Sequence, residues 1–450
     1  MDPLSLDQIA MITEGQVVGA TPSRPVTEVV LDSRRAVPGS LFVALPGSRV
    51  EGYAFAADAA ARGAVAVLAS RPVDALPTIV VEQPAAALAA LGAACRDRSP
   101  ARLVAVTGSN GKTTVKELLA GMLGGVGTTL ATEGNRNNLI GVPEMLCRLD
   151  ASYQYAVIEM GANAPGEINQ LAAWACPQVG VVTNAGPAHL EGFGSLAGVA
   201  RAKGELFEGL PDDGVAVINA DDEFAGFWRE LAGSRRCLTF GRHAGQFRYR
   251  GQGRRLELDF GSGWMAAPTA LLGAHNAANI AAASACAAAL EVPARSILSA
   301  VAAAQPVPGR LQLCSGCHGG WVIDDTYNAN PGSLQAAVEA LHELEGPVWL
   351  MLGAMGELGE QTAYWHRQAG EMARVAGVAR LWTVGEGAAP AAEGFGEGGR
   401  CFPHHQALID ACAAELPADA VVLIKGSRLA AMEQVAQALV AEDPEQGGVA

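Results

Sequence analysis

The sequence has little positive charge. Its 450 residues include 31 Lys and Arg against 46 Asp and Glu, which gives a formal net charge of −15. A nucleic-acid-binding protein needs a basic face to neutralise phosphates, so we expect no nucleic-acid partner. Half of the residues are hydrophobic. A chain of this length and composition can therefore form about two or three domains, each with its own core.

Basic residues are also missing from the N-terminal segment, and long apolar runs are scarce. Residues 1–10 carry Asp2 and Asp7 but no Lys or Arg, so we expect no signal peptide there. Residues 271–290 are uncharged, but Ala dominates over Leu and His275 interrupts the run. We predict a buried helix rather than a membrane span, in a soluble cytosolic protein.

Cysteine is too scattered to form a disulfide framework. The nine cysteines are odd in number, and a chain of this size does not depend on disulfides for its core. The segment Cys314-Ser-Gly-Cys317-His318 matches the pattern of c-type haem attachment. We expect no export signal and find no second pair of metal ligands nearby in the sequence. We therefore interpret this segment as a turn before a strand at 321–324, not as a haem or zinc site.

The order of the predicted elements indicates an α/β fold. Strand-like runs alternate with alanine-rich helical runs, a pattern typical of largely parallel sheets. Two stretches, 96–100 and 305–309, have the composition of linkers. We predict three domains: a smaller N-terminal α/β domain over 1–98, a central domain over 99–306 and a C-terminal domain over 307–450. The glycine-rich segment 385–399 is predicted to be a mobile loop.

The stretch LVAVTGSNGKTT, residues 103–114, has the properties of a phosphate-binding loop but not its usual spacing. The usual loop has Gly, four residues and then Gly-Lys-Ser/Thr, and here Val106 stands where the first Gly is expected. A strand still leads through glycines into a helix, whose N-terminus can hold a phosphate. Lys112 can reach the β- and γ-oxygens, and Thr113 can ligate Mg²⁺. An ordinary glycine-rich turn would not explain the Lys-Thr-Thr sequence.

Polar side chains also follow other predicted strands of the central domain. Glu159 ends one strand and Gly161 follows two residues later, a typical place for a Mg²⁺ ligand, although it also fits a solvated strand-end acid. His189 follows the next strand, at the edge where α/β proteins bind ligands. A lone His is more often structural. From the residues alone, Lys203 is an exposed helical lysine near Glu205.

The alanine-rich helix carries two amides on one face. Asn276 and Asn279 are three residues apart, which is the spacing of neighbours on a helix surface. Such amides can pair with the edge of a purine. Capping of the helix by Asn276 is an equal alternative.

These stretches, taken in order, resemble the Mur ligase family of ATP-dependent, amide-forming enzymes. The pattern continues with Pro308-Gly309-Arg310, with DDTYNANP at 324–331 and with KGSR at 425–428, so that it covers nearly the whole chain. The resemblance implies a central P-loop-type domain that binds ATP. It also implies a Rossmann-like C-terminal domain that completes the site, and an N-terminal domain that binds a UDP-linked substrate.

The resemblance also implies roles for individual residues. Lys112, His189, Lys203 and Asn328 would be catalytic. ATP would contact Gly108, Ser109, Asn110, Gly111, Lys112, Thr113, Thr114, Asn276, Asn279, Arg310 and Asp325. Two Mg²⁺ sites would involve Thr113, Glu159, His189 and Lys203, and CO₂ would carbamylate the Lys203 amine to make it an oxygen ligand.

Two stretches point to one branch of the family. TEGNRNNLIGVP at 132–143 and DDTYNANPGS at 324–333 resemble the member that adds D-alanyl-D-alanine. This implies a monomeric ligase of peptidoglycan precursor synthesis that forms an acyl phosphate on UDP-N-acetylmuramoyl-tripeptide. That substrate would contact Asp32, Ser33, Arg34, Asn137 and Asn138. D-Alanyl-D-alanine would contact Tyr327, Asn328, Asn330, Lys425 and Ser427.

Three alternatives remain open. A sister ligase that adds a single amino acid and a folylpolyglutamate synthase both belong to the family, but the YNANP stretch argues against them. An ATP-hydrolysing switch without ligase activity would not need Arg310, Asp325 and the KGSR segment. One residue departs from the family pattern: Tyr53 stands where a His usually follows Gly.

Overall fold

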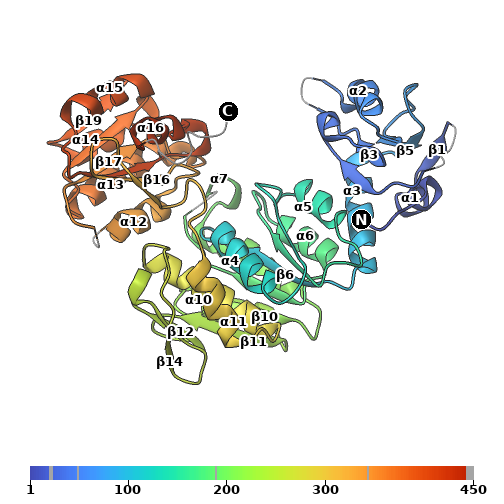
Figure 1. Ribbon diagram of the computed structural model, residues 1–450, viewed down its shortest axis with the longest axis horizontal. Coiled ribbons are helices and arrows are strands. Elements are labelled where there is room, and N and C mark those ends of the chain that lie inside the picture. Colours follow the sequence, from blue (N-terminus) through green and yellow to red (C-terminus); the bar gives the residue numbers. More distant parts are fainter. Residues whose placement is uncertain (20–23, 48–49, 188–189, 342–343, 442–450) are drawn as a thin grey trace.

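The protein folds into three α/β units that follow one another along the chain (Figure 1). The computed structural model describes residues 1–19, 24–47, 50–187, 190–341 and 344–441. The N-terminal and C-terminal units lie on either side of the central one. Each unit has its own sheet, and most strand pairs are parallel. The predicted fold class is confirmed.

The N-terminal unit has a five-stranded sheet with strand order β1-β5-β4-β3-β2. Only β1 is antiparallel to its neighbour. Every residue of β3 and β4 is buried, as expected for parallel strands covered on both faces. The elements are α1 (Leu6–Ile12), β1 (Gln16–Val18), β2 (Glu28–Val30), β3 (Ser40–Val43), α2 (Ala56–Ala61), β4 (Ala66–Ala69), β5 (Thr78–Val80) and α3 (Pro84–Arg98).

The end of α3 corrects the predicted linker at 96–100. Arg96 belongs to the helix, and only 6% of its surface is exposed. Its Nε donates to the carbonyl of Ala175 in the central unit, at 2.8 Å. A polar composition suggested a solvated linker, but the guanidinium instead binds carbonyls at the end of another helix.

The central unit has a nine-stranded sheet with strand order β14-β13-β12-β11-β10-β9-β6-β8-β7. Strands β6 to β12 are parallel, and an unpredicted antiparallel extension, β12 to β14, continues one edge. The strands are β6 (Arg102–Thr107), β7 (Thr129–Ala131), β8 (Tyr155–Glu159), β9 (Val179–Val182), β10 (Val215–Asn219), β11 (Arg236–Gly241), β12 (Phe247–Arg250), β13 (Glu257–Asp259) and β14 (Trp264–Ala266). The helices are α4 (Lys112–Gly124), α5 (Gly141–Leu146), α6 (Glu167–Ala175), α7 (Leu190–Phe193), α8 (Leu196–Glu208), α9 (Ala225–Ala232), α10 (Ala274–Ala289) and α11 (Ala294–Ala303).

The alanine-rich helix α10 is buried in the central unit, as predicted. It packs against α4 and against the face of the sheet that carries β10 to β12. Small side chains let a helix approach its neighbours closely, and a helix that is apolar on all sides belongs in a core. Across the described ranges, no helix combines the length and the apolar character that a membrane span requires.

The C-terminal unit has a six-stranded sheet with strand order β15-β16-β20-β17-β18-β19, in which only β15 runs antiparallel. The predicted turn before the strand is confirmed for Cys317 and His318, whereas Cys314 lies in strand β15 and pairs with Val322. The elements are β15 (Gln312–Ser315), β16 (Trp321–Asp325), α12 (Pro331–Ala340), β17 (Val348–Leu352), α13 (Thr362–Val375), β18 (Arg380–Val384), α14 (Ala389–Phe395), β19 (Gly399–Phe402), α15 (His405–Glu415), β20 (Val421–Lys425) and α16 (Glu433–Leu439).

The prediction of a mobile loop at 385–399 is wrong. The segment contains a short 3-10 helix at Glu386–Ala388 and helix α14, which packs on α13 and β19. Ala391 and Phe395 are buried in the core of this unit. Glycines such as Gly394 and Gly399 occur there because a Cβ would overlap the backbone of a neighbouring helix, not because the chain is loose.

Candidate active site

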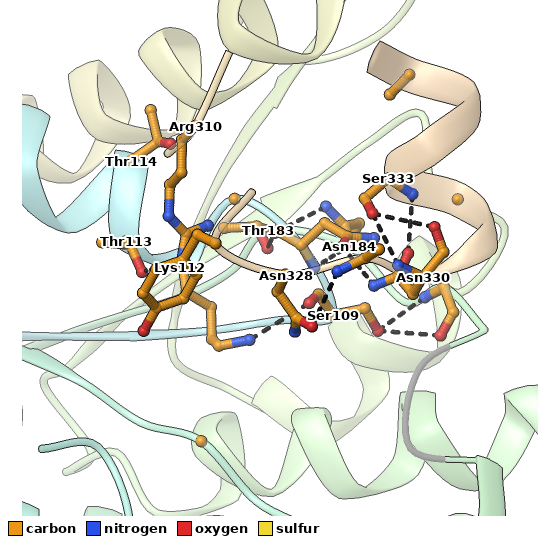
Figure 2. A pocket seen from close by; sticks show the side chains of 18 of the residues that line it. Ser109, Lys112, Thr113, Thr114, Thr183, Asn184, Arg310, Asn328, Asn330 and Ser333 are labelled. Carbon is orange, nitrogen blue, oxygen red and sulfur yellow. Dashed lines mark hydrogen bonds between the residues drawn. The ribbon is translucent and has the colours of Figure 1, made fainter. Parts of the chain in front are cut away.

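The central and C-terminal units together line a cavity of about 990 Å³. It lies at the carboxyl ends of β6, β8 and β9, where open α/β sheets bind ligands. Figure 2 shows part of its wall, with Lys112, Thr113 and Arg310 on one side of the view and Asn330 and Ser333 on the other. The wall includes these predicted residues: Ser109, Asn110, Gly111, Lys112, Thr113, Thr114, Asn137, Asn138, Glu159, Lys203, Asn276, Asn279, Arg310, Asp325, Tyr327, Asn328, Asn330, Lys425 and Ser427.

The two glycines of the 108–111 loop are required by close approaches. Gly108 has φ 141° and Gly111 has φ 84°, both in regions that favour glycine. A Cβ on Gly108 would overlap Thr183 Oγ1, and a Cβ on Gly111 would overlap the Asn279 amide. Glycine is therefore required at 108 and 111 because Thr183 and Asn279 occupy the space that a Cβ would need.

We expect a Gly111→Ala variant to bind ATP at least about tenfold more weakly. A left-handed backbone costs a residue with a Cβ about 1–2 kcal/mol, and the overlap with Asn279 adds to this. Isothermal titration with a non-hydrolysable ATP analogue measures the loss. Gly121→Ala on the same helix is the control, because its Cβ would meet no atom within 4 Å. Equal affinity in both variants would contradict the assignment.

The loop after β9 supports the backbone of the phosphate-loop candidate. Thr183 Oγ1 and Asn184 Nδ2 both donate to the carbonyl of Asn110, at 2.6 and 3.1 Å. Asn184 Oδ1 accepts the Asn110 N–H at 3.0 Å. Ser109 Oγ donates to the Gly186 carbonyl at 3.1 Å and accepts its N–H at 2.9 Å. The loop is therefore held in shape by side chains of a neighbouring strand end.

Lys112, the first residue of α4, turns back over the loop. Its Nζ donates to the carbonyls of Gly108 and Ser109, at 2.7 and 3.3 Å. Burial lowers the pKa of the Lys112 amine, and the nearby Glu159 carboxylate acts in the opposite direction. The amine thus lies at the mouth of the loop, close to the position that the helix N-terminus offers to an anion.

Glu159 is the centre of a polar cluster at the end of β8. Only 3% of its surface is exposed. Its two carboxylate oxygens accept hydrogen bonds from Thr113 Oγ1 at 3.0 Å and from Asn137 Nδ2 at 2.8 Å. Hydroxyl and carboxylate oxygens are the ligands that Mg²⁺ prefers, with phosphate and water completing its shell. Thr113 and Glu159 therefore fit one Mg²⁺ site, whereas no described group of three or more His, Cys, Asp and Glu forms a metal site alone.

Lys203 is buried, so the interpretation as an exposed lysine is wrong. Only 1% of its surface is exposed, and it points from α8 into the cavity. Burial and, secondarily, the nearby Lys112 lower its pKa to about 7. Glu205 is occupied elsewhere, since its carboxylate accepts the backbone N–H groups of Gly166 and Asn169. His189, the remaining predicted metal ligand, lies outside the described residues.

Arg310 crosses from the C-terminal unit to the phosphate-loop helix. Its Nη2 donates to Thr113 Oγ1 at 2.9 Å, and its guanidinium lies 4.3 Å from the centre of the Tyr327 ring. Its buried Nε has no acceptor among the described residues. A buried donor without an acceptor costs free energy. A phosphate oxygen at this position would supply that acceptor.

A second contact between the units joins the loop to helix α12. Asn330 Nδ2 donates to Asn110 Oδ1 at 2.9 Å. Asn330 also caps α12. Its Oδ1 accepts the backbone N–H of Ser333, and the Ser333 hydroxyl accepts the backbone N–H of Asn330. Arg310 and Asn330 thus both connect the C-terminal unit to the phosphate loop and its helix.

Asp325 and Lys425 form a buried ion pair under the 327–330 segment. Lys425 Nζ lies 2.5 Å from Asp325 Oδ2 and 2.8 Å from the carbonyl of Asn328. Burial raises the pKa of Asp325, and Lys425 opposes this shift. Both residues line the cavity, and their pairing also fixes the backbone at Asn328.

The amides of α10 lie as predicted on one face. Asn279 Nδ2 donates to Asn276 Oδ1 at 3.1 Å, and Asn276 Nδ2 donates to the Leu272 carbonyl at 2.8 Å. Gly273, not Asn276, is the N-cap of the helix. The capping alternative is therefore wrong, and both amides remain on the cavity wall.

The residues predicted to hold the UDP-linked substrate are divided between two units. Asp32, Ser33 and Arg34 lie in the N-terminal unit, where Arg34 forms an ion pair with Asp32 at 2.7 Å and lowers the Asp32 pKa to about 2. Tyr53 lies in the same unit, 3.7 Å under the guanidinium of Arg71. Asn138 caps the turn into α5 by accepting two N–H groups.

Sequence reasoning did not assign several residues of the cavity wall. They include His275, Ser333, Gly356, Glu357, Leu358, Arg428 and Leu429. The signal that selected Glu159, an acid near the end of a buried strand and close to glycine, also occurs at Glu357, which follows β17 and is next to Gly356. Applying that rule to the C-terminal unit would have found it.

Comparison with known families agrees with this site. Three family models match the chain: "Mur ligase family, catalytic domain" over 25–105, "Mur ligase middle domain" over 106–287 and "Mur ligase, glutamate ligase domain" over 309–428. The chain belongs to the Mur ligase family. The predicted resemblance is confirmed.

Individual members of the Mur ligase family are similar over nearly the full length. A UDP-N-acetylmuramoyl-tripeptide–D-alanyl-D-alanine ligase of Escherichia coli K12 is 42% identical, covering 98% of this chain and 99% of that protein. The crystal structure of MurF from Acinetobacter baumannii is 33% identical with a TM-score of 0.91, covering 97% of this chain and 98% of that one. MurF of Thermotoga maritima in complex with ADP is 29% identical with a TM-score of 0.82, covering 92% and 97%.

Proposed function

We propose that this Mur ligase joins D-alanyl-D-alanine to the terminal carboxylate of UDP-N-acetylmuramoyl-tripeptide, with ATP as the energy source. The observation that carries the proposal is the cavity between two units. It combines an anion-binding helix N-terminus, a buried guanidinium with an unused donor and a carboxylate–hydroxyl pair. The full-length similarity to ligases of this specificity supports the choice of substrates.

The reaction proceeds in two displacements. ATP lies with its phosphates on the N-terminus of α4, where Lys112 and Arg310 contact them, and with its adenine near Asn276 and Asn279. The tripeptide carboxylate attacks the γ-phosphorus, which gives an acyl phosphate and ADP. The amino nitrogen of the dipeptide, after losing a proton, then attacks the acyl carbon, and phosphate leaves. The protein contributes mainly positioning and neutralisation of charge.

We propose that Mg²⁺ occupies two places in this cavity. Thr113 and Glu159 would hold the first, and His189 and a carbamylated Lys203 the second. Bound Mg²⁺ would neutralise phosphate charge during transfer. A lysine with a pKa of about 7 is partly neutral at physiological pH, and only the neutral amine reacts with CO₂. This supports the carbamate.

Water must be excluded while the acyl phosphate exists, because water would hydrolyse this intermediate. The contacts of Arg310 with Thr113 and of Asn330 with Asn110 support a role for the C-terminal unit as the cover. We propose domain limits of 1–98, 99–306 and 307–450, since each sheet falls within one of these ranges. We also propose that the enzyme acts as a monomer, because one chain supplies all of the residues named. We propose the cytosol as its compartment.

The remaining substrate contacts follow the same division. Asp32, Ser33 and Arg34 would bind the UDP end in the N-terminal unit, and Asn137 and Asn138 would face the peptide end. Tyr327, Asn328, Asn330, Lys425 and Ser427 would surround the incoming dipeptide.

Phosphate release by the purified protein tests the proposal. With ATP, Mg²⁺ and UDP-N-acetylmuramoyl-tripeptide, release should require D-alanyl-D-alanine, and the pentapeptide product should be visible by mass spectrometry. Release without any amine would indicate an ATP-hydrolysing switch instead. Release driven by a single amino acid would indicate the sister activity.

A further inference from the structure

The loop after β17, residues 353–358, is firmly attached to the C-terminal unit. The Gly353 N–H donates to the Lys425 carbonyl at 2.8 Å, and the Ser427 N–H donates to the Ala354 carbonyl at 3.0 Å. The Met355 N–H donates to Nε2 of the buried His366 at 2.9 Å. Met355 and Leu358 are buried in the core of the unit. The backbone that carries Glu357 is therefore held in place by the rest of the unit.

Glu357 has a left-handed backbone with φ 61°. This conformation is unfavourable for a residue with a Cβ and is retained only where the surroundings enforce it. Glu357 is exposed, so burial of its side chain does not explain the strain. It lines the cavity. Burial lowers the pKa of both Lys112 and Lys203, and the negative charge of Glu357 acts in the opposite direction. The carboxylate thus faces the place where the phosphate chemistry occurs.

Two further side chains on the same wall follow β20. The Arg428 side chain is 71% exposed, and its only ion pair among the described residues is a long one, 3.6 Å, to Glu433. Leu429 is 97% exposed, although it is a large apolar residue. Both line the cavity. The wall therefore has a guanidinium and an apolar side chain that are largely exposed, and the Glu357 carboxylate lines the same cavity.

We propose that Glu357 binds the ammonium group of the incoming dipeptide, Arg428 binds its terminal carboxylate and Leu429 contacts its methyl groups. This inference rests on the proposed function and names a subsite for its amine substrate. An extended dipeptide places its charged ends about 7 Å apart. One acid, one base and one apolar side chain match a zwitterion whose side chains are uncharged. Because Glu357 and both lysines line the same cavity, this arrangement brings the amino group toward the transferred acyl phosphate.

Steady-state kinetics of Glu357→Gln tests the ammonium contact. We expect the KM for D-alanyl-D-alanine to rise at least about tenfold, because the charge pair with the ammonium group is lost. The KM values for ATP and the UDP-linked substrate, and the Mg²⁺ requirement, should change less than about twofold. Glu360→Gln, an exposed acid three residues along that does not line the cavity, should match the wild type. An unchanged KM for the dipeptide, or an equal effect on Mg²⁺ or ATP, would overturn the assignment.

A substrate analogue tests the carboxylate contact independently. The wild type should prefer D-alanyl-D-alanine over D-alanyl-D-alaninamide at least about tenfold in kcat/KM, and Arg428→Gln should abolish that preference. Retention of the preference in the variant would overturn the role of Arg428. If the wild type itself showed no dipeptide-dependent turnover, the proposed function would fail. A dipeptide-dependent wild type with unaffected variants would reject only the subsite.

Discussion

Lys112→Ala should lose at least about 3 kcal/mol of transition-state stabilisation, or roughly 100-fold or more in kcat/KM. The Lys112 amine lies over the loop carbonyls at the N-terminus of α4, close to where the helix favours an anion. As charge shifts onto the leaving β-phosphate oxygen, this amine would neutralise it. Rapid-quench measurement of phosphate formation from saturating ATP separates this effect from binding.

Lys116→Ala provides the matched comparison. Lys116 is a buried lysine one turn along the same helix, its amine contacts Glu117, and it does not line the cavity. We expect this variant to keep kcat within about twofold of the wild type, with thermal unfolding as the check on folding. Near-normal turnover of Lys112→Ala would remove the phosphate-loop assignment.

Lys203→Ala should lose most activity and regain a measurable part of it with added acetate. The variant removes the side chain that we propose to carry a carbamate, and a small carboxylate can occupy the same space. The pKa of about 7 means that the neutral amine predominates only above that pH. Carbamate formation and activity in CO₂-containing buffer should therefore both decrease as the pH drops below 7.

A carbon-13 spectrum in labelled bicarbonate measures the carbamate directly. The wild type should show a signal that is absent from Lys203→Ala. Lys116→Ala should retain that signal, since only the site lysine is expected to react. A fully active Lys203→Ala variant, or an identical spectrum from both proteins, would reject the carbamate.

Much of the fold could be predicted because parallel strands have a simple signature. Buried runs such as 103–106 and 179–182 have no polar side chain and are followed directly by Thr107 and Thr183, so both the strand and its functional end are visible in the sequence. The phosphate loop was recognisable for the same reason. Lys112 and Thr113 follow a strand directly, and local order alone brings them to the site.

Other features depend on partners distant in the sequence. Lys203 is predicted as exposed from local composition, but it is buried because α8 packs over the end of the central sheet. The glycines of 385–399 suggest mobility, whereas they permit close helix packing. The antiparallel strands β12 to β14 have polar and charged residues, since one edge of the sheet is only partly covered. Such outcomes follow from tertiary contacts rather than from local propensity.

The burial of Arg96 against the central unit affects how this chain can be divided. A fragment that began at residue 99 would remove α3, which packs on α5 and α6, and would leave the Ala175 carbonyl without its guanidinium donor. A recombinant central domain should therefore start before α3, near residue 83, to remain soluble. By contrast, a cut at 305–309 falls between α11 and β15, in a segment that belongs to no helix or strand. The chain is therefore better divided after the central unit, at 305–309, than before it, at residue 99.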